Sequence, residues 1–329
     1  MKILVVGAGA TGLSCAVRLV EAGHDVAVLA RDLAAETASA LAPGAWLPAA
    51  VLSTLLPAAD TAPGPADRAL LARWAGETRA EAGTGTGVGS LPGRVLTGAR
   101  PPHLSGDPVT EGPADARVLG AAERPPGRAA GWAWTGPVVD PVRRLRVLTA
   151  RLEAGGGTLT RAALPALPER PEVVVDATGL AARALVPDDA VQPVRLEWVH
   201  VTGVDVEHWA VDLADPARPV QVAPVEGGAV VTRTEVGPWD LTARAQDAHE
   251  LLARAGALEP RLAAGRTAGH RVALLGARPT PRVVTTPRPD GCPVVHCYGL
   301  GAAVWSLAWG AAADVVAAVT ALETSGAPA

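Results

Sequence analysis

Residues 2–23 read KILVVGAGATGLSCAVRLVEAG, and this stretch decides the fold. KILVV is a short apolar run of the kind that forms a buried parallel strand. The turn GAGATG follows it, and LSCAVRLVEAG then places apolar residues at helical spacing. Gly23 ends the predicted helix, and HDVAVLARD at residues 24–32 has the pattern of a second strand. The stretch therefore predicts a β-α-β unit within residues 2–32.

Three glycines in the turn have the G-x-G-x-x-G spacing of a dinucleotide-binding site. The first permits a tight turn, the second lets the backbone approach a pyrophosphate, and the third lets helix and strand pack closely. Amides at the helix N-terminus attract phosphates, and an acidic residue about 20 positions further on holds a ribose hydroxyl. The residues assigned to these tasks are Gly7, Gly9, Ala10, Thr11, Gly12, Arg31 and Asp32. A dinucleotide site follows, with NAD and FAD both still open.

The composition limits the classes of protein to consider. The chain has 329 residues, 49% of them apolar, and a formal net charge of −4, which suits one large or two interleaved domains. Its basic residues are scattered, so no nucleic-acid partner is expected. The three cysteines, Cys15, Cys292 and Cys297, form neither a C-x-x-C pair nor a zinc spacing, and the first apolar run is too short for a signal peptide. We therefore expect a reduced, cytoplasmic setting and no metal site.

The middle of the chain is predicted to be rich in strands. Helices are expected at residues 66–82, from near Asp140–Pro141 to the following glycines, and at roughly 242–256. Residues 196–236 alternate as in an antiparallel sheet. Residues 83–130 are dense in Gly and Pro, which leaves open a loop with short strands or a partly mobile segment.

The last apolar stretch, residues 302–322, is long enough to cross a bilayer. It is mostly alanine, however, and it carries Asp314. We expect a buried helix and no membrane partner.

A second glycine turn lies far from the first, where VVVDA at residues 173–177 leads directly into Thr178 and Gly179. A later strand of this kind is typical of flavoproteins. With it, the sequence resembles the D-amino-acid oxidase family, whose relatives include D-aspartate oxidase and glycine oxidase. The matching stretches keep the family's order along nearly the whole chain: VVGAGATGLSCAVRLVEAGHDVAVLARD, TASALAPGAWLP, GWAWTGPVVDPVRRL, VVDATGLAARAL, GPWD, GHRVALLGARPTPRV and PVVHCYGLGAAVWSLAWG.

The resemblance implies a mixed α/β fold in two parts. A Rossmann-like FAD-binding domain would be built from residues 1–50, 136–190 and 286–329, with an inserted antiparallel-sheet substrate domain from residues 51–135 and 191–285. It also implies FAD as cofactor and, as partners, an amino acid or amine and O₂. A homodimer is left open.

The same resemblance implies further contacts to FAD. These are assigned to Thr37, Ser39, Gly44, Trp46, Thr178, Gly179, Gly299, Gly301, Ala302, Ala303, Val304, Trp305 and Ser306. In the family the last loop reads Y-G-H-G-G-x-G, whereas Leu300, Ala302 and Val304 stand here for its His and two of its Gly residues. If position 304 needed a positive φ, Val304 would be strained by about 1–3 kcal/mol.

For the substrate, the resemblance implies Arg282 as the catalytic residue. It matches the arginine that pairs bidentately with the substrate carboxylate, a task that suits a planar guanidinium. Gln221 and Ala302 are also assigned to the substrate, and the family's two active-site tyrosines fall near Ala217 and Gln221. Two further departures are Arg195-Leu196-Glu197 for Arg-Gly-Gln and Val231-Thr232-Arg233 for Gly-Gly-Thr.

The activity implied is the oxidative deamination of a D-amino acid, with hydride transfer to FAD and reoxidation by O₂ to give H₂O₂. Two alternatives stay open. One is an oxidase or dehydrogenase of glycine or secondary amines, and the other is a catalytically lapsed member that acts as a binding protein.

Overall fold

The computed structural model describes residues 1–42, 44–57, 64–83, 85–98, 112–169 and 171–325. Its described strands form one mixed sheet of 13 strands in the order β4-β5-β3-β9-β10-β11-β8-β12-β13-β7-β1-β2-β6. The strands are β1 (Lys2–Val6), β2 (Asp25–Ala30), β3 (Val88–Thr97), β4 (Arg117–Val118), β5 (Ala130–Val139), β6 (Thr158–Arg161), β7 (Val173–Asp176), β8 (Gln192–Thr202), β9 (Trp209–Asp212), β10 (Val220–Val225), β11 (Gly228–Val236), β12 (Arg266–Thr286) and β13 (Val294–Leu300).

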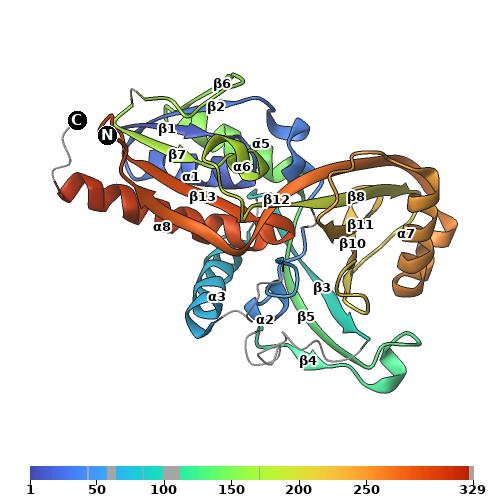
Figure 1. Cartoon of the computed structure of the whole chain (residues 1–329). Coiled ribbons are helices and arrows are strands. Elements are labelled where there is room, and N and C mark those ends of the chain that lie inside the picture. Colours follow the sequence, from blue (N-terminus) through green and yellow to red (C-terminus); the bar gives the residue numbers. More distant parts are fainter. Residues whose placement is uncertain (43, 58–63, 84, 99–111, 170, 326–329) are drawn as a thin grey trace.

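One end of the sheet is parallel and covered by helices. Strands β13, β7, β1, β2 and β6 run parallel to one another. Helix α1 (Ala10–Glu21) joins β1 to β2 and packs against α5 (Pro141–Ala154) and α8 (Val304–Thr324), and α8 also contacts α3 (Pro65–Ala80). Figure 1 shows α8 and α3 below the strands β1, β7 and β13. The predicted β-α-β unit is confirmed.

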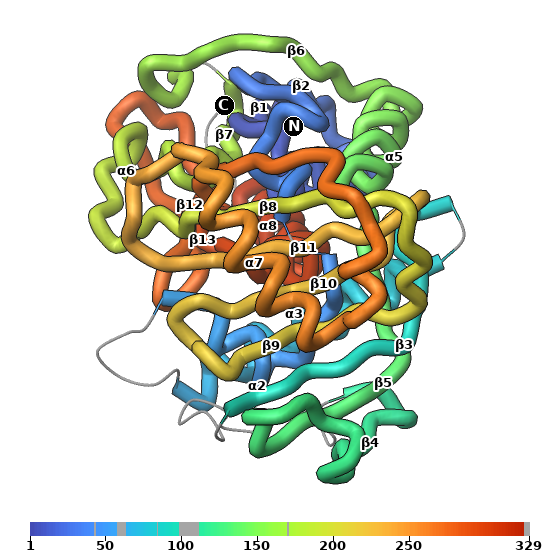
Figure 2. Tube along the Cα trace, turned by 90° about the vertical axis from the view of Figure 1, so that its right-hand side faces the viewer, coloured from blue at the N-terminus to red at the C-terminus, as the bar shows by residue number. Residues whose placement is uncertain are grey.

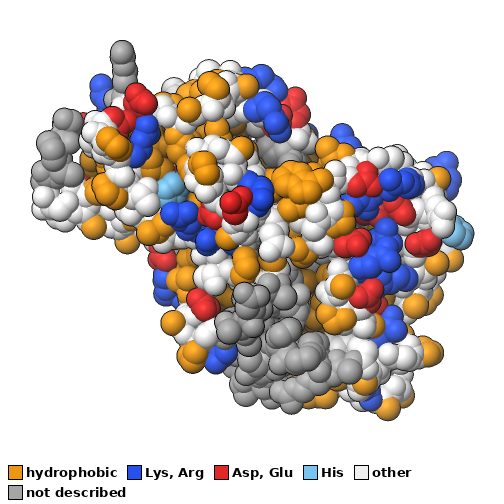
Figure 3. Space-filling view, viewed as in Figure 1, with side chains coloured by type: hydrophobic (Ala, Val, Ile, Leu, Met, Phe, Trp, Pro, Cys, Tyr) orange, Lys and Arg blue, Asp and Glu red, His pale blue; other side chains and the backbone are white. Residues whose placement is uncertain are grey.

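The other end is mostly antiparallel. Strands β9, β10, β11 and β8 pair in that order, as the alternation over 196–236 predicts, although β9 runs parallel to β3 on its outer side. Helix α7 (Ala245–Leu258) covers the antiparallel strands, and its Leu251, Ala255 and Leu258 are fully buried against them. On the face in Figure 3, acidic and basic side chains are intermixed over this end.

Strand β12 joins the two ends of the sheet. It pairs with β8 along its first half and with β13 along its second, with a register shift between Ala277 and Arg282. Figures 1 and 2 show it crossing from one end to the other. The sequence did not reveal this 21-residue strand, because Gly276, Pro279 and Pro281 interrupt its pattern. Since one sheet runs through the molecule, the two-domain boundaries stay a prediction.

Helix limits agree with the sequence within a few residues. Helix α5 begins where predicted, because Asp140 accepts the amide of Arg143 at 3.0 Å and Pro141 fits the first turn. The helix predicted over residues 66–82 corresponds to α3, and the helix predicted at roughly 242–256 corresponds to α7. Shorter helices are α2 (Ala49–Leu52) and α6 (Ala182–Leu185), with 3₁₀ turns at 34–36, 38–40, 121–123, 179–181, 260–264 and 301–303. Within 83–130, residues 84 and 99–111 lie outside the described part, and the rest contains β3, β4 and the start of β5.

Helix α8 is apolar on nearly all sides. The stretch Gly301–Thr324 is the one described helix whose length and mean hydropathy of 1.6 would suffice to cross a membrane, and 72% of that window is buried within the protein. Its Asp314 accepts both terminal nitrogens of Arg73 at 2.6 Å and Nε1 of Trp74 at 2.9 Å. The helix is thus held against α3 by its one acidic residue in the apolar stretch.

Candidate functional site

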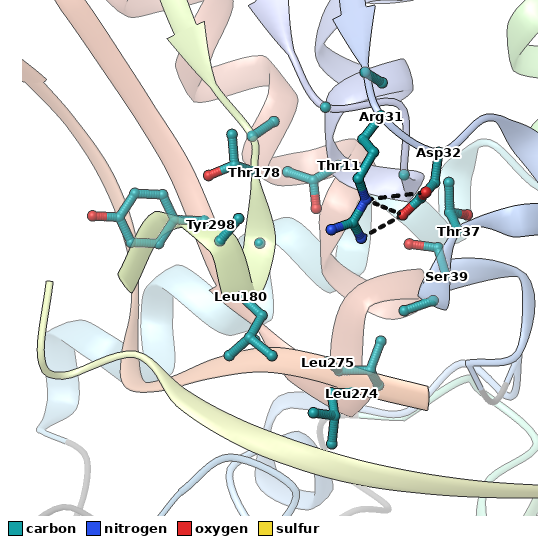
Figure 4. Close-up of a pocket in the computed structure, with 18 of the residues that line it drawn as sticks. Thr11, Arg31, Asp32, Thr37, Ser39, Thr178, Leu180, Leu274, Leu275 and Tyr298 are labelled. Carbon is teal, nitrogen blue, oxygen red and sulfur yellow. Dashed lines mark hydrogen bonds and ion pairs between the residues drawn. The ribbon is translucent and has the colours of Figure 1, made fainter. Parts of the chain in front are cut away.

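A large cavity of about 1250 Å³ opens where the carboxyl ends of β1 and β7 meet. Its lining comes from Val6–Gly9, Thr11, Leu29–Asp32, Ala35–Ser39, Leu41, Ala162–Leu164, Ala177–Ala181, Arg183–Leu185, Asp189, Trp239, Leu241, Arg271–Gly276, Tyr298–Gly301 and Val304. Figure 4 shows Arg31 and Asp32 at one end, Thr11 and Thr178 in the middle, and Tyr298 at the other end. Parallel α/β sheets bind ligands at this edge, which makes the large cavity the candidate cofactor site.

The first glycine turn has the geometry of a phosphate site. Gly7 has φ +113°, which favours glycine, and a Cβ at Gly12 would lie 1.9 Å from the carbonyl oxygen of Gly7. Gly9 is the N-cap of α1 and supplies no side-chain cap. In the first turn of α1, the amide of Ala10 donates to Ser39 Oγ at 3.0 Å. The amides of Thr11 and Gly12 can donate to a ligand at the positive end of the helix.

The second glycine turn is fixed by the last residue of β7. Asp176 is fully buried, and one of its carboxylate oxygens accepts both the amide of Thr178, at 3.2 Å, and its hydroxyl, at 2.7 Å. Gly179 follows with φ +60°, and a Cβ there would meet no atom within 4 Å. The turn therefore needs glycine for its backbone conformation and presents Thr178 to the cavity.

Asp32 stands at the outer end of the large cavity. Arg31 donates to it through Nε at 3.1 Å and Nη2 at 2.6 Å (Figure 4). These hydrogen bonds hold the pKa of the Asp32 carboxyl below its ordinary value. The group stays ionised at neutral pH, so it can accept hydrogen bonds from a ribose.

The last loop is not strained at its substituted positions. Val304 has φ −52° and ψ −43°, and Leu300 has φ −77°, which are both ordinary for L-residues. The positive φ values belong to Gly299 at +89° and Gly301 at +50°, the two positions that remain glycine. The strain considered for Val304 is therefore absent, and Val304 packs as a buried residue at the cavity wall.

The predicted cofactor residues divide into two groups. Those that line the large cavity are Gly7, Gly9, Thr11, Arg31, Asp32, Thr37, Ser39, Thr178, Gly179, Gly299, Gly301 and Val304. Those that do not are Ala10, Gly12, Gly44, Trp46, Ala302, Ala303, Trp305 and Ser306. In the second group, Trp305 supports the wall, since its Nε1 donates to the carbonyl of Ser39 at 3.1 Å, whereas Trp46 Nε1 donates to the carbonyl of Ala75 in α3 at 2.7 Å.

The sequence missed two apolar parts of the wall. Ala162–Leu164 follow β6, and Arg271–Gly276 belong to β12. Apart from Arg271 and Gly276 at its ends, the second stretch is apolar like the first, so neither has the pattern of a binding loop. The one available signal was the apolar run within GHRVALLGAR, which the prolines after it obscured.

Arg282 belongs to a cluster with a buried carboxylate. Its Nη1 donates to Asp188 Oδ2 at 3.0 Å and to the hydroxyl of Tyr298 at 2.9 Å, and Tyr298 itself donates to Asp188 at 2.8 Å. Arg278 Nε also lies 3.2 Å from Asp188 Oδ2. Burial alone would raise the pKa of Asp188, but the hydrogen bonds from Tyr298 and Arg282 outweigh it, and the net pKa is lowered. Burial and the bond to Asp188 raise the pKa of Tyr298, which stays protonated.

A small cavity of about 230 Å³ lies elsewhere, on the sheet face away from α7. Its lining is Ala40, Ala42, Gly44, Val139–Val142, Trp198, His200, Gln221, Ala223, Val225, Glu226, Val230 and Thr232. Gln221 is therefore at a cavity, as expected for a substrate residue. Arg282 and Ala302 line neither cavity. Arg282 follows the register shift in β12 and lies against Asp188, so its assignment to the substrate stays a prediction.

Two residues at which the chain departs from the family's sequence pattern, Glu197 and Arg233, form an ion pair. Glu197 on β8 stands directly opposite Arg233 on β11 and pairs with its guanidinium. Glu197 also lies 3.3 Å from Arg195 Nη1 and 2.9 Å from His270 Nε2, and its side chain is completely buried. Asp247 on α7 approaches Arg195 at 3.3 Å. No pattern in the sequence predicts that residues 197 and 233 form an ion pair.

Comparisons with known proteins agree with this geometry. The family model described as FAD dependent oxidoreductase, DAO, matches residues 2–318. A D-amino-acid oxidase of Rubrobacter xylanophilus is 33% identical over 328 residues, covering 96% of this chain and 95% of that protein. One of Streptomyces coelicolor is 34% identical over 321 residues, covering 95% of each. Among solved structures, iminodiacetate oxidase from Chelativorans sp. BNC1 has a similar fold, with TM-score 0.73, 21% identity, and 97% and 95% of the two chains covered.

Proposed function

The chain belongs to the DAO family of FAD-dependent oxidoreductases, and we propose that within it the protein oxidises a D-amino acid to the imino acid. The observation that carries the substrate class is the similarity to two bacterial D-amino-acid oxidases along nearly the whole chain. No observation favours glycine, a secondary amine or a lapsed enzyme.

The residues of the large cavity fit FAD. Drug-sized ligands use sites of roughly 300–1,000 Å³, and this cavity of about 1250 Å³ has room for a dinucleotide. Gly7, Gly9 and Thr11 would hold the pyrophosphate, and Asp32 a ribose. Bound FAD supplies a two-electron acceptor that O₂ reoxidises with release of H₂O₂. The chain's own part is to orient the substrate and exclude water.

Arg282 is proposed as the residue that holds the substrate carboxylate. The described hydrogen bonds from its guanidinium to other side chains all use Nη1, which Asp188 and Tyr298 fix in place. The side chain is 27% exposed. The edge formed by Nε and Nη2 has no partner among the described residues, so it can receive a carboxylate with two parallel hydrogen bonds. Asp188 and Tyr298 then act as positioning residues.

Mixing the FAD-loaded protein with D-amino acids in the absence of oxygen tests the activity. We expect the yellow flavin absorption to bleach with at least one D-amino acid and to stay unchanged with its L-enantiomer. Readmitting O₂ should restore the colour and produce one H₂O₂ per imino acid. Bleaching with glycine or sarcosine but with no D-amino acid would replace this function by the amine oxidase alternative. An FAD-loaded protein that bleaches with none of these compounds would contradict both.

Arg282→Leu tests the carboxylate site. Hydrogen bonds to charged groups contribute about 1.5–3 kcal/mol each, so loss of two should lower kcat/KM for the preferred D-amino acid about 100-fold or more. Arg271→Leu is the matched control, because Arg271 lines the large cavity and no described ion pair involves it. If the control lost activity and Arg282→Leu kept it, the carboxylate would belong to Arg271. FAD content is measured for both variants.

A cytoplasmic location is proposed as well. Cys15, Cys292 and Cys297 are all free thiols, which agrees with a reducing compartment. Fractionation of cells that express the full-length protein would test this. The proposed partners are the amino acid and O₂.

A further inference from the structure

The small cavity contains buried polar atoms that lack partners. Gln221 is 4% exposed, and its Oε1 has no hydrogen bond in the described structure. His200 Nε2 is also buried and unpaired. An unsatisfied buried acceptor costs about 1–3 kcal/mol. A ligand that donates N–H groups into this cavity would recover that free energy.

The charged side chains that line the small cavity are all acidic. Asp140 and Glu226 supply two carboxylates, and the described lining contains no Lys or Arg. Asp140 already caps α5, whereas Glu226 makes no described ion pair. Trp198 adds an aromatic ring, which attracts cations to its face. Acceptors, carboxylates and an indole together favour an ammonium or guanidinium group and disfavour a carboxylate.

The small cavity neighbours the large one along two elements. In the segment 38–44, Ala38, Ser39 and Leu41 line the large cavity, whereas Ala40, Ala42 and Gly44 line the small one. Across the β8–β12 ladder, Trp198 of the small cavity is the register partner of Arg271 of the large one. The two cavities therefore share walls at residues 38–44 and at the β8–β12 ladder.

We infer that the small cavity is the side-chain subsite and that it selects D-amino acids with a cationic side chain, through Gln221, Trp198 and Glu226. This rests on the proposed function. At about 230 Å³, the cavity is smaller than the roughly 300–1,000 Å³ used by drug-sized ligands, so it suits one lysine-sized side chain and not a larger group.

D-lysine and D-norleucine test the inference, because they share a four-carbon side chain and differ by the terminal ammonium. We expect kcat/KM of the FAD-loaded protein to be at least about tenfold higher for D-lysine, which corresponds to about 1.4 kcal/mol. The preference should shrink as NaCl is raised, since Glu226 is solvent-exposed and its field is screened.

Two variants locate the effect. Glu226→Gln and Gln221→Leu should each reduce the D-lysine to D-norleucine ratio severalfold, mainly through KM for D-lysine. Glu235→Gln is the matched control, because Glu235 is a partly exposed carboxylate on β11 that lies 3.7 Å from Arg218 Nε and does not line the small cavity. It should leave the ratio unchanged.

The outcomes separate this inference from the proposed function. A ratio near one in the wild-type protein, with D-norleucine still bleaching the flavin, would overturn the cationic subsite and leave the oxidase intact. So would a ratio that both Glu226→Gln and Gln221→Leu leave unchanged. Absence of bleaching with every D-amino acid would instead remove the proposed function.

Discussion

Replacing Glu197 by Gln is expected to lower the free energy of unfolding by about 3–5 kcal/mol. Glu197 is completely buried between Arg233, Arg195 and His270. Gln keeps the shape of the side chain but removes its negative charge. Two guanidiniums that are at most 7% exposed then lose the carboxylate that compensates them. Urea unfolding at a fixed, saturating FAD concentration measures the change.

A double-mutant cycle distinguishes this pair from ordinary packing. Arg233→Thr alone should also destabilise the protein, because it leaves Glu197 with one guanidinium fewer. Glu197→Gln with Arg233→Thr should cost less than the sum of the two single changes, by about 0.5–3 kcal/mol. Glu123→Gln, which breaks the exposed pair with Arg117, is the control and should leave the unfolding midpoint unchanged. Additive single effects would show that the two residues are not coupled.

Gly12→Ala is expected to yield a protein that does not retain FAD and is destabilised by about 2–3 kcal/mol. The added Cβ would lie 1.9 Å from the carbonyl oxygen of Gly7 and 2.8 Å from its carbonyl carbon. Backbone atoms cannot turn aside as a side chain can, so either α1 moves away from β1 or the phosphate turn opens. Both changes remove the amides from the pyrophosphate site. Flavin absorption after gel filtration, together with thermal unfolding, measures both effects.

Gly76→Ala provides the matched control. Gly76 lies inside α3, and a Cβ there would meet no atom within 4 Å. The same chemical change should therefore leave FAD binding intact and stabilise the helix by about 0.5–1 kcal/mol. If Gly12→Ala retained as much FAD as Gly76→Ala, close packing at the first turn would not be needed for the cofactor.

The phosphate half of the site could be predicted because its determinants are local. Gly7, Gly9 and Gly12 lie within a dozen residues of one strand and one helix, and Asp32 follows the end of the next strand by two residues. Short segments carry their own geometry through φ, helix capping and strand pairing. Gly299 and Gly301 are a further local feature, because their positive φ values are conformations that glycine adopts readily.

The substrate half could not be predicted in this way. The position of Arg282 depends on a register shift within β12, and its partner Asp188 is 94 residues away along the chain. Likewise, Gln221 reaches a cavity because β10 pairs with β11 so that Gln221 and Thr232 share one face. Sequence similarity assigned both residues to the substrate, whereas their surroundings are set by the pairing of strands far apart in the chain.

By itself, the sequence determined the β-α-β unit and the two glycine turns, since these rest on the conformational preferences of neighbouring residues, and the resemblance along the chain indicated the family. Only the tertiary structure decided that Glu197 neutralises Arg233, that Asp188 holds Arg282, and that Gln221 faces a cavity of acidic character. Charges and unpaired polar atoms acquire their energetic meaning from what surrounds them after burial, and strand register, which brings those surroundings together, is set over the whole sheet.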